Sequence, residues 1–187
     1  DPTERGVVAT ATYEARRFGV RSGMPFRTAR RLCPDAVYLP TDFVEYARWS
    51  RVFKAAMQEF SPLFEDRGID EAYLDISASA EPSETLGRRL KARILADTGM
   101  TCSIGIAPNK LVAKIASDLD KPDGLTIVND GDIAQRIWPL PARRIPGVGP
   151  KAEQKLAVIG IHTIGELAQA PMVELARHFG SSMARFM

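Results

Sequence analysis

The chain has 187 residues, of which 45% are hydrophobic and 26% are charged, and its formal net charge is +2. This length and composition suit a globular protein of one or two domains with a substantial core, and no apolar run is long enough for a membrane helix. The first five residues lack the pattern of a secretory signal, so we expect a cytoplasmic protein with no membrane partner.

The two cysteines, Cys33 and Cys102, follow no metal-ligand spacing, and we expect both to be reduced, partly buried thiols. The charges are unevenly distributed. Residues 1–41 hold seven Lys and Arg against four Asp and Glu, residues 42–141 hold 12 against 16, and residues 142–187 hold six against three. An acidic centre between basic flanks suits a carboxylate site that holds cations between phosphate-binding segments, although differences of this size also arise by chance.

The first segment combines small residues with a helical turn. Residues 6–12 are small, β-branched and apolar, and they predict a short strand or tight loop that leads into a helix at Tyr13. Tyr13 and Arg16 would share one face of that helix, where a phenol and a guanidinium suit a phosphate. An exposed helix face explains this pair equally well. A loop at 22–25 then precedes a short basic helix over 27–32.

The clearest helix spans 43–60, because six apolar or aromatic residues recur on one side of it. Core packing would explain this stripe in full. The six residues are Phe43, Tyr46, Ala47, Phe53, Met57 and Phe60.

The most informative stretch places Asp70 and Glu71 at the mouth of an apolar, aromatic strand. Carboxylates are rarely buried unless they are paired or bind a metal. These two could reach one ion only where the strand pleat is broken, at a turn that Gly68 permits. We therefore expect strands over 63–69 and 72–77 to form an antiparallel hairpin with the carboxylates at its corner. A solvated turn that covers a sheet edge is the alternative.

Two further elements complete this region. Ser83 is expected to cap a helix that ends at Gly99, and the alternation over 100–107 predicts a half-buried strand. The order helix, strand, strand, helix, strand over 43–107 is that of a ferredoxin-like sheet without its first strand. Because that strand is central, its absence would leave an unpaired ladder, so we expect the chain to be a fragment. Residues 6–10 could fill the gap in principle, but the intervening segment is too long and structured for a simple connection.

The next helix is expected to begin at Pro108 and Asn109 and to have one apolar and one basic face. A lysine face can bind phosphates, but a solvated face is the alternative. Residues 125–128 predict another short strand. The expected buried residues of the helix are Leu111, Ile115 and Leu119, and the basic ones are Lys110, Lys114 and Lys121.

The last third of the chain reads as short helices and glycine turns. Gly147 and Gly149 stand just before a helix start, where they would expose backbone N–H groups, and Lys151 adds charge there. With the amphipathic segment 152–159, they have the pattern of a helix-hairpin-helix that grips a nucleic-acid phosphate without reading bases. A plain pair of helices joined by a turn is the alternative.

Six motifs, in this order, resemble the Y-family DNA polymerases of the DNA polymerase IV type, over nearly the whole chain. The resemblance implies an α+β fold, with fingers over 1–41, a ferredoxin-like palm without its first strand over 42–127, and a small helical thumb with a helix-hairpin-helix over 128–187. The motifs are Ala-Thr-Ala-Thr-Tyr13-Glu-Ala-Arg16, Ile-Asp70-Glu71-Ala-Tyr-Leu-Asp, Ser-Ile-Gly-Ile-Ala-Pro-Asn-Lys110, Lys114-Ile-Ala-Ser-Asp, Lys121-Pro-Asp-Gly and Ile-Pro-Gly-Val-Gly-Pro.

The resemblance also implies roles for single residues. Asp70 and Glu71 match the second and third catalytic carboxylates, which hold two Mg²⁺ ions. The residues matching those that bind the incoming triphosphate are Thr10, Tyr13, Arg16 and Lys121. The small residues roofing the nascent base pair correspond to Ala9 and Gly23, and the thumb element that holds the duplex corresponds to the hairpin of Gly147, Gly149 and Lys151.

By the same resemblance, the function is template-directed DNA synthesis of the translesion type by two-metal-ion catalysis. The expected partners are primer-template DNA, deoxynucleoside triphosphates and a sliding clamp bound through parts not present here. The family's first catalytic Asp, its ribonucleotide-excluding aromatic residue and its little-finger domain have no counterpart, so we expect this chain alone to be inactive. The alternatives are a non-catalytic DNA-binding module derived from a polymerase and a palm-fold nucleotide cyclase, although a cyclase gives no reason for the thumb-like hairpin.

Overall fold

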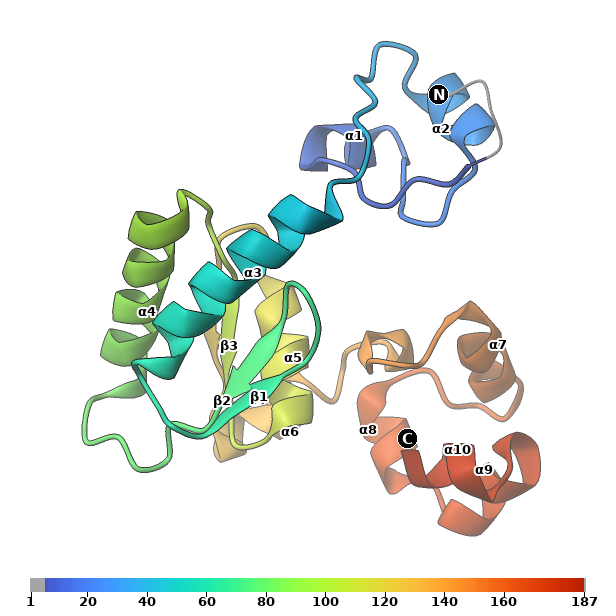
Figure 1. Ribbon diagram of the computed structural model, residues 1–187. Helices are drawn as coiled ribbons and strands as arrows, with labels where there is room; N and C mark the ends of the chain where they lie inside the picture. The colour runs from blue at the N-terminus through green and yellow to red at the C-terminus, as the bar shows by residue number, and fades with distance from the viewer. Residues whose placement is uncertain (1–5, 187) are drawn as a thin grey trace. The chain divides into compact units, whose positions relative to one another are not determined.

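The structure is a computed structural model that describes residues 6–186 (Figure 1). The chain divides into two compact units, residues 1–47 and residues 48–187, and each unit has its own core. Within the described part of the chain, no helix combines the length and the apolar character needed to cross a membrane.

The first unit is rich in loops and has two short helices, α1 (Tyr13–Arg17) and α2 (Phe26–Leu32). The predicted helix at Tyr13 and the basic helix over 27–32 are both confirmed. An isolated antiparallel bridge joins Val7 to Pro25, so residues 6–10 pair within this unit. The core of the unit is small. Val8, Val20 and Ala29 are buried at its centre, and partly buried apolar side chains pack around them.

The helix α3 (Phe43–Gln58) confirms the predicted helix, but core packing does not explain its whole apolar stripe. Phe43 is 70% exposed and Tyr46 is 40% exposed. Only the later part of the stripe, with Phe53 and Met57, packs against the buried residues of α4. The apolar stripe is longer than the core it packs against. Periodicity identifies an apolar face of a helix, but it does not show that another element packs along the whole of that face.

After α3, the second unit has two pairs of strands connected by helices, which confirms the predicted alternation, although each strand is shorter than expected. In the antiparallel hairpin, β1 pairs with β2, and in the parallel pair, β3 pairs with β4. The elements are β1 (Phe64–Asp66), β2 (Ala72–Leu74), α4 (Ser83–Thr98), β3 (Ile104–Ile106), α5 (Lys110–Leu119) and β4 (Leu125–Ile127).

The two strand pairs are separate sheets, and no strand among the described residues joins β2 to β3. Leu74 of β2 and Ile104 of β3 nevertheless pack against the same buried cluster, which contains Leu90 and Ile94 of α4. This is the arrangement expected of a ferredoxin-like sheet in which the central strand is not among the described residues.

Two predicted details of the helices are wrong. Ser83 is the first residue of α4, and Pro82 occupies the capping position, whereas Gly99 ends the helix in the left-handed region as expected. In α5, Leu111 is 44% exposed and Val112 is buried instead. The reason is that Val112, Ile115 and Ala116 form the face of α5 that is buried in the main core, a face rotated from the predicted one.

The remaining residues form short helices around the main core, which also includes the buried face of α5. Leu156 is fully buried at its centre, together with Ile137 and Val128. These short helices are η1 (Asp130–Asp132), α6 (Ile133–Arg136), η2 (Ala142–Arg144), α7 (Pro150–Val158), α8 (Ile164–Gln169), α9 (Met172–Phe179) and α10 (Ser181–Phe186). Both cysteines are free and partly buried, as expected, and burial raises the pKa of the Cys102 thiol.

Candidate nucleotide and nucleic-acid site

Asp70 and Glu71 lie in the loop that joins β1 to β2, and both are exposed. Gly68 has a φ of 130°, a conformation that L side chains rarely adopt, and its N–H donates a hydrogen bond to Asp66 Oδ1 at 2.9 Å. The N–H of Arg67 donates to the Glu71 carbonyl at 3.1 Å and closes the hairpin. The predicted hairpin corner is therefore confirmed.

A lysine that the sequence analysis missed fixes the start of this loop. Lys54 of α3 donates hydrogen bonds to both carboxylate oxygens of Asp66 at 2.8 Å and to the Gly68 carbonyl at 2.6 Å. The hydrogen bond from Lys54 is the main cause that lowers the pKa of Asp66. The partners are 12 or more residues apart in sequence, so no local pattern could have identified this contact.

The basic face of α5 turns toward the acidic hairpin. Lys110 Nζ lies 2.7 Å from Glu65 Oε2, and Lys114 forms an ion pair with Glu71. The hydrogen bond from Lys110 lowers the pKa of Glu65. Burial alone would lower the pKa of Lys114, but its hydrogen bond to Glu71 and the charges around it raise the pKa overall. Lys110 and Lys114 are thus ion-paired with the hairpin. They form neither the solvated face nor the free phosphate-binding face that the sequence left open.

Lys121 was expected on the basic face of the helix, but α5 ends at Leu119, so Lys121 lies just beyond it. Its side chain is 41% exposed, with its Nζ 2.5 Å from Asp118 Oδ1. Exposed ion pairs of this kind contribute little to stability, on the order of 0–1 kcal/mol. An anionic ligand could therefore draw Lys121 away from Asp118 at small cost.

Asp70 and Glu71 offer the oxygen donors that Mg²⁺ prefers. Across residues 6–186, however, no group of three or more His, Cys, Asp or Glu is placed to hold a metal ion. The two carboxylates thus fit part of a magnesium site, in which Mg²⁺ would also be coordinated by oxygens of water or of substrate phosphates.

In the first unit, Tyr13 and Arg16 lie together as predicted. The Arg16 guanidinium lies 5.2 Å from the centre of the Tyr13 ring, and its Nε donates to the Ala11 carbonyl at 3.0 Å. Thr12 caps the short helix by accepting a hydrogen bond from the Ala15 N–H at 3.3 Å. A preset guanidinium beside a phenol can bind an anion without first ordering a free side chain.

The small residues of the first unit come from two neighbouring segments. The Gly23 N–H donates to the Val8 carbonyl at 2.8 Å, and the Ser22 hydroxyl donates to the Ala9 carbonyl at 2.7 Å. Gly23 has a φ of 77°, and a Cβ added there would meet no atom within 4 Å. Both Ala9 and Thr10 are exposed. These segments therefore lie side by side and expose Ala9, Thr10 and Gly23.

The glycine hairpin of the second unit is anchored by the buried side chains of Ile145 and Val148. Between them the chain turns at Gly147, which has a φ of 92°, and Gly149 then precedes the first turn of α7. The exposed Lys151 lies in that first turn, where the unpaired N–H groups of a helix favour an anion. The predicted turn followed by a helix is confirmed.

Two protein-family models match most of this chain. Residues 1–118 match the model of the impB/mucB/samB family, and residues 143–186 match a model described as the DNA polymerase-iota thumb domain. The chain belongs to the impB/mucB/samB family. The resemblance to the Y-family DNA polymerases is therefore confirmed.

The curated relatives of this impB/mucB/samB chain include two DNA polymerase IV proteins. That of Moorella thermoacetica is 43% identical over 184 residues, a match covering 96% of this chain and 46% of the relative. That of Methanoculleus marisnigri is 46% identical over 183 residues, covering 97% of this chain and 51% of the relative. The chain thus spans about half the length of the curated relatives it matches.

Solved structures support the same family fold. DinB from Sulfolobus solfataricus matches with a TM-score of 0.88 and 33% identity, covering 97% of this chain and 55% of that one. An insertion ternary complex of Dbh DNA polymerase matches with a TM-score of 0.89 and 33% identity, covering 97% and 54%. The predicted α+β fold of fingers, palm and helical thumb is therefore confirmed, whereas the exact boundaries at 41 and 127 remain predictions.

Two arginines that the sequence analysis did not single out, Arg143 and Arg144, directly precede the glycine hairpin, and the fold brings Lys114 and Asp118 of α5 beside them. A hollow of about 450 Å³ lies beside the hairpin in the second unit. Its charged side chains comprise three cations and one carboxylate, which favours an anionic ligand. The hollow is lined by Lys114, Asp118, Arg143, Arg144 and residues 145–149. The adjacent arginines before Ile-Pro-Gly were a usable signal in the sequence.

Proposed function

We propose that this chain forms the fingers, palm and thumb of a template-directed DNA polymerase of the translesion type. The observation that carries the proposal is the hairpin corner with Asp70 and Glu71, braced by lysines, in a chain that matches DNA polymerase IV proteins along almost its whole length. The proposed boundaries are 1–41, 42–127 and 128–187. The substrates would be primer-template DNA and deoxynucleoside triphosphates, and the similar structure of Dbh DNA polymerase is an insertion ternary complex.

In this proposal Asp70 and Glu71 are ligands of Mg²⁺, two ions in all, and neither acts as a general acid or base. When bound, such ions lower the pKa of the attacking hydroxyl and stabilise the charge of an in-line displacement at phosphorus. Lys114 pairs with the Glu71 carboxylate and keeps it close to α5. Lys54 holds the start of the same loop through Asp66 and Gly68.

The remaining site residues divide into nucleotide and duplex contacts. In the first group, Thr10, Tyr13, Arg16 and Lys121 would bind the triphosphate, and Ala9 and Gly23 would leave room for the nascent base pair. In the second group, Gly147, Gly149 and Lys151 would hold the duplex backbone without reading bases. A sliding clamp would bind elsewhere, and a bacterial or archaeal enzyme acting on the chromosome would work in the cytoplasm.

Primer extension by the product of the complete gene tests the proposal. We expect addition of templated nucleotides to a recessed primer in the presence of Mg²⁺ and none with EDTA. Tight duplex binding without any extension would instead support the non-catalytic DNA-binding module, which shares the glycine hairpin but needs no carboxylate corner.

Substitutions of Arg16 and Lys151 should affect different quantities, the nucleotide KM and the duplex Kd, because the proposal assigns the two residues to different ligands. Arg16→Ala is expected to raise the nucleotide KM and slow incorporation, since it removes positive charge from the triphosphate, while the duplex Kd changes little. Lys151→Ala is expected to weaken duplex binding for all sequences alike and to reduce the salt dependence by about one unit of slope. Nucleotide kinetics and duplex titrations at several salt concentrations measure both effects, and identical profiles for the two variants would contradict the assignment.

A further inference from the structure

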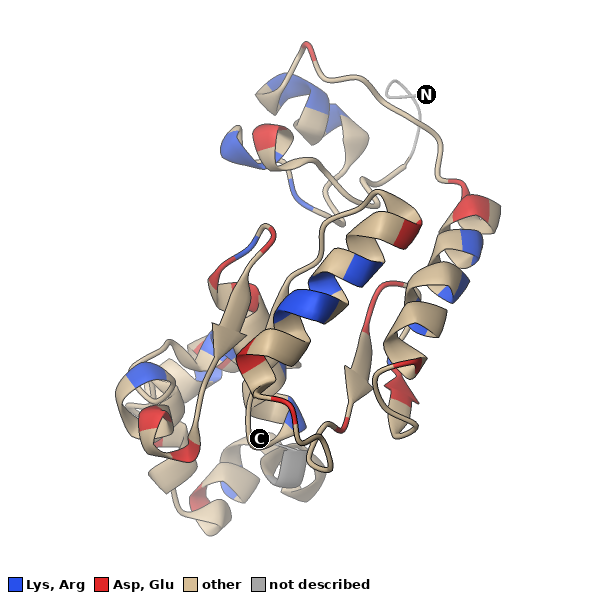
Figure 2. Cartoon of the chain, turned by 90° about the vertical axis from the view of Figure 1, so that its left-hand side faces the viewer, with Lys and Arg blue, Asp and Glu red and all other residues tan. Residues whose placement is uncertain are grey.

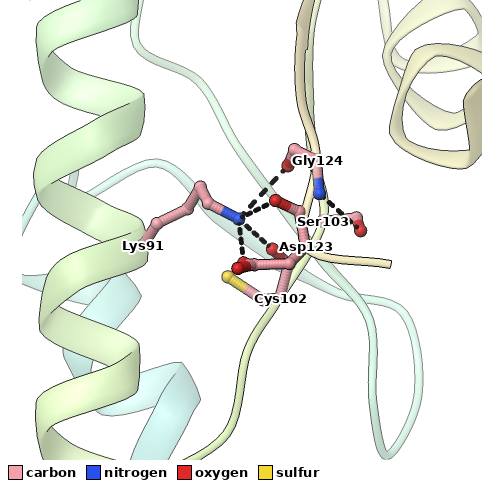
Figure 3. Close-up of polar contacts among 5 residues, drawn as sticks. All are labelled: Lys91, Cys102, Ser103, Asp123 and Gly124. Atoms are coloured by element: carbon pink, nitrogen blue, oxygen red, sulfur yellow. Dashed lines mark hydrogen bonds and ion pairs between the residues drawn. The ribbon is translucent and has the colours of Figure 1, made fainter. Parts of the chain in front are cut away.

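Lys91 of α4 contacts two other segments of the chain, one at Cys102 and one at residues 123–124 (Figure 3). Its Nζ donates hydrogen bonds to the Cys102 carbonyl at 2.5 Å and to the Asp123 carbonyl at 2.8 Å. It also lies 2.5 Å from Asp123 Oδ1 and 3.4 Å from the Gly124 carbonyl. A lysine ammonium has three N–H donors, so the three short contacts use all of them.

The other basic residues of α4 behave differently. Figure 2 shows Lys and Arg positions in blue along the helix nearest the viewer, which is α4. Arg88 pairs with Glu84, Arg89 pairs with Glu81, and Arg93 pairs with Glu59 and Asp97, all of them carboxylates. Lys91 is only 18% exposed, and in addition to its ion pair with the Asp123 carboxylate it donates to main-chain carbonyls. Its role is therefore to hold a backbone, which a surface charge pair does not do.

The held backbone is a tightly wound connection between α5 and β4. Asp123 has a φ of 61°, a left-handed conformation that costs a residue with a side chain about 1 kcal/mol or more. A Cβ on Gly124 would lie 2.4 Å from the Asp120 carbonyl oxygen, so the turn leaves no space there. The Gly124 N–H donates to the Ser103 hydroxyl at 3.2 Å, and the Ile104 N–H donates to the Gly124 carbonyl at 3.0 Å.

Lys121 precedes this fixed point by only two residues. Its side chain forms an exposed ion pair with Asp118, a neighbour on the same stretch of chain, so the direction in which it can reach depends on the backbone of residues 122–124. Lys91 fixes that backbone to α4 and, through Cys102, to the start of β3.

We propose that Lys91 is a positioning residue for nucleotide binding: by holding Asp123 and Gly124, it fixes the loop from which Lys121 reaches the triphosphate. This rests on the proposed function, in which Lys121 binds the nucleotide. Lys91 itself touches no substrate, and it acts only through the loop.

The test is a double-mutant cycle in the product of the complete gene. Lys91→Met keeps an unbranched side chain, one atom shorter, and removes its charge. It should raise the nucleotide KM about 10-fold, with the duplex Kd unchanged, because a small displacement of a binding group is costly. In a Lys121→Ala background, the same substitution should change KM less than about twofold, because contacts acting through one residue are not additive. Arg93→Met is the matched control on α4, and its nucleotide KM should equal that of the unaltered protein.

Hydrogen exchange supplies a readout independent of polymerisation. In Lys91→Met the amides of residues 123–126 should exchange faster, whereas in Arg93→Met they should not. The positioning role is overturned if Lys91→Met leaves KM unchanged, raises it equally with and without Lys121, or leaves the exchange of these amides unchanged. If Lys121→Ala binds nucleotide normally, or the unaltered protein extends no primer, the proposed function fails and the positioning role with it, even where the exchange result confirms the contact.

Discussion

Asp70→Asn and Glu71→Gln, made separately in the product of the complete gene, are each expected to lower nucleotide incorporation by about 1,000-fold or more. Each change keeps the size of the side chain and removes the charge that would hold Mg²⁺, and metal stabilisation of the transition state is worth several kcal/mol, with each ~1.4 kcal/mol giving about tenfold in rate. Single-turnover incorporation with saturating nucleotide measures the chemical step, and the duplex Kd should stay within about twofold, because the proposed duplex contacts lie in the glycine hairpin.

Asp75→Asn is the matched control for this prediction. Asp75 follows the same hairpin, but its carboxylate accepts a hydrogen bond from the Ser77 N–H at 2.9 Å, and contacts with Ser77 lower its pKa. The Asp75 carboxylate therefore stabilises the turn after β2, and its substitution should leave the rate of nucleotide incorporation close to normal. A normal rate in both Asp70→Asn and Glu71→Gln, or an equal loss in Asp75→Asn, would show that the hairpin corner has no specific role in the reaction.

Gly105→Ala is expected to destabilise the second unit by about 3 kcal/mol, at the upper end of the usual cost of overpacking. A Cβ at this position of β3 would lie 2.0 Å from the Ala113 carbonyl oxygen and 2.5 Å from the Ser117 nitrogen. Both are backbone atoms of α5, so the clash can be relieved only if the whole helix moves. That movement would also draw Lys110 and Lys114 away from the acidic hairpin.

Denaturant unfolding measures this loss, and Gly131→Ala is the control. No atom lies within 4 Å of a Cβ added to Gly131, so its substitution should change the free energy of unfolding by less than about 0.5 kcal/mol. Equal stabilities of the Gly105→Ala and Gly131→Ala proteins would show that β3 and α5 do not approach as closely as described.

The features that could be predicted from the sequence are those set by neighbours along the chain. Gly68 permits the turn, and the apolar strand after Asp70 and Glu71 then makes the hairpin corner the simplest solution. Asn109 caps α5 with a hydrogen bond from the Val112 N–H at 2.9 Å, and Gly99 ends α4, each as the local pattern indicated.

Burial was harder to predict, because it depends on what lies opposite a helix face. The stripe of α3 has the correct period, yet Phe43 is exposed because the core does not extend to it. In α5, Val112 is buried in place of Leu111 because the side of the helix that carries Val112 packs into the main core. Both errors have one origin, since a period fixes the spacing of apolar residues but not the direction from which a partner arrives.

By itself, the sequence determined the order of elements, the hairpin corner with Asp70 and Glu71, the glycine hairpin before α7 and, through six motifs, the family. Only the tertiary structure decided which charges meet. Lys54 reaches Asp66, Lys114 reaches Glu71, and Lys91 reaches Asp123 from 32 residues away. The physical reason is that a hydrogen bond depends on distances of about 3 Å in space, whereas the sequence records only separation along the chain, so these pairs exist only once the elements have packed.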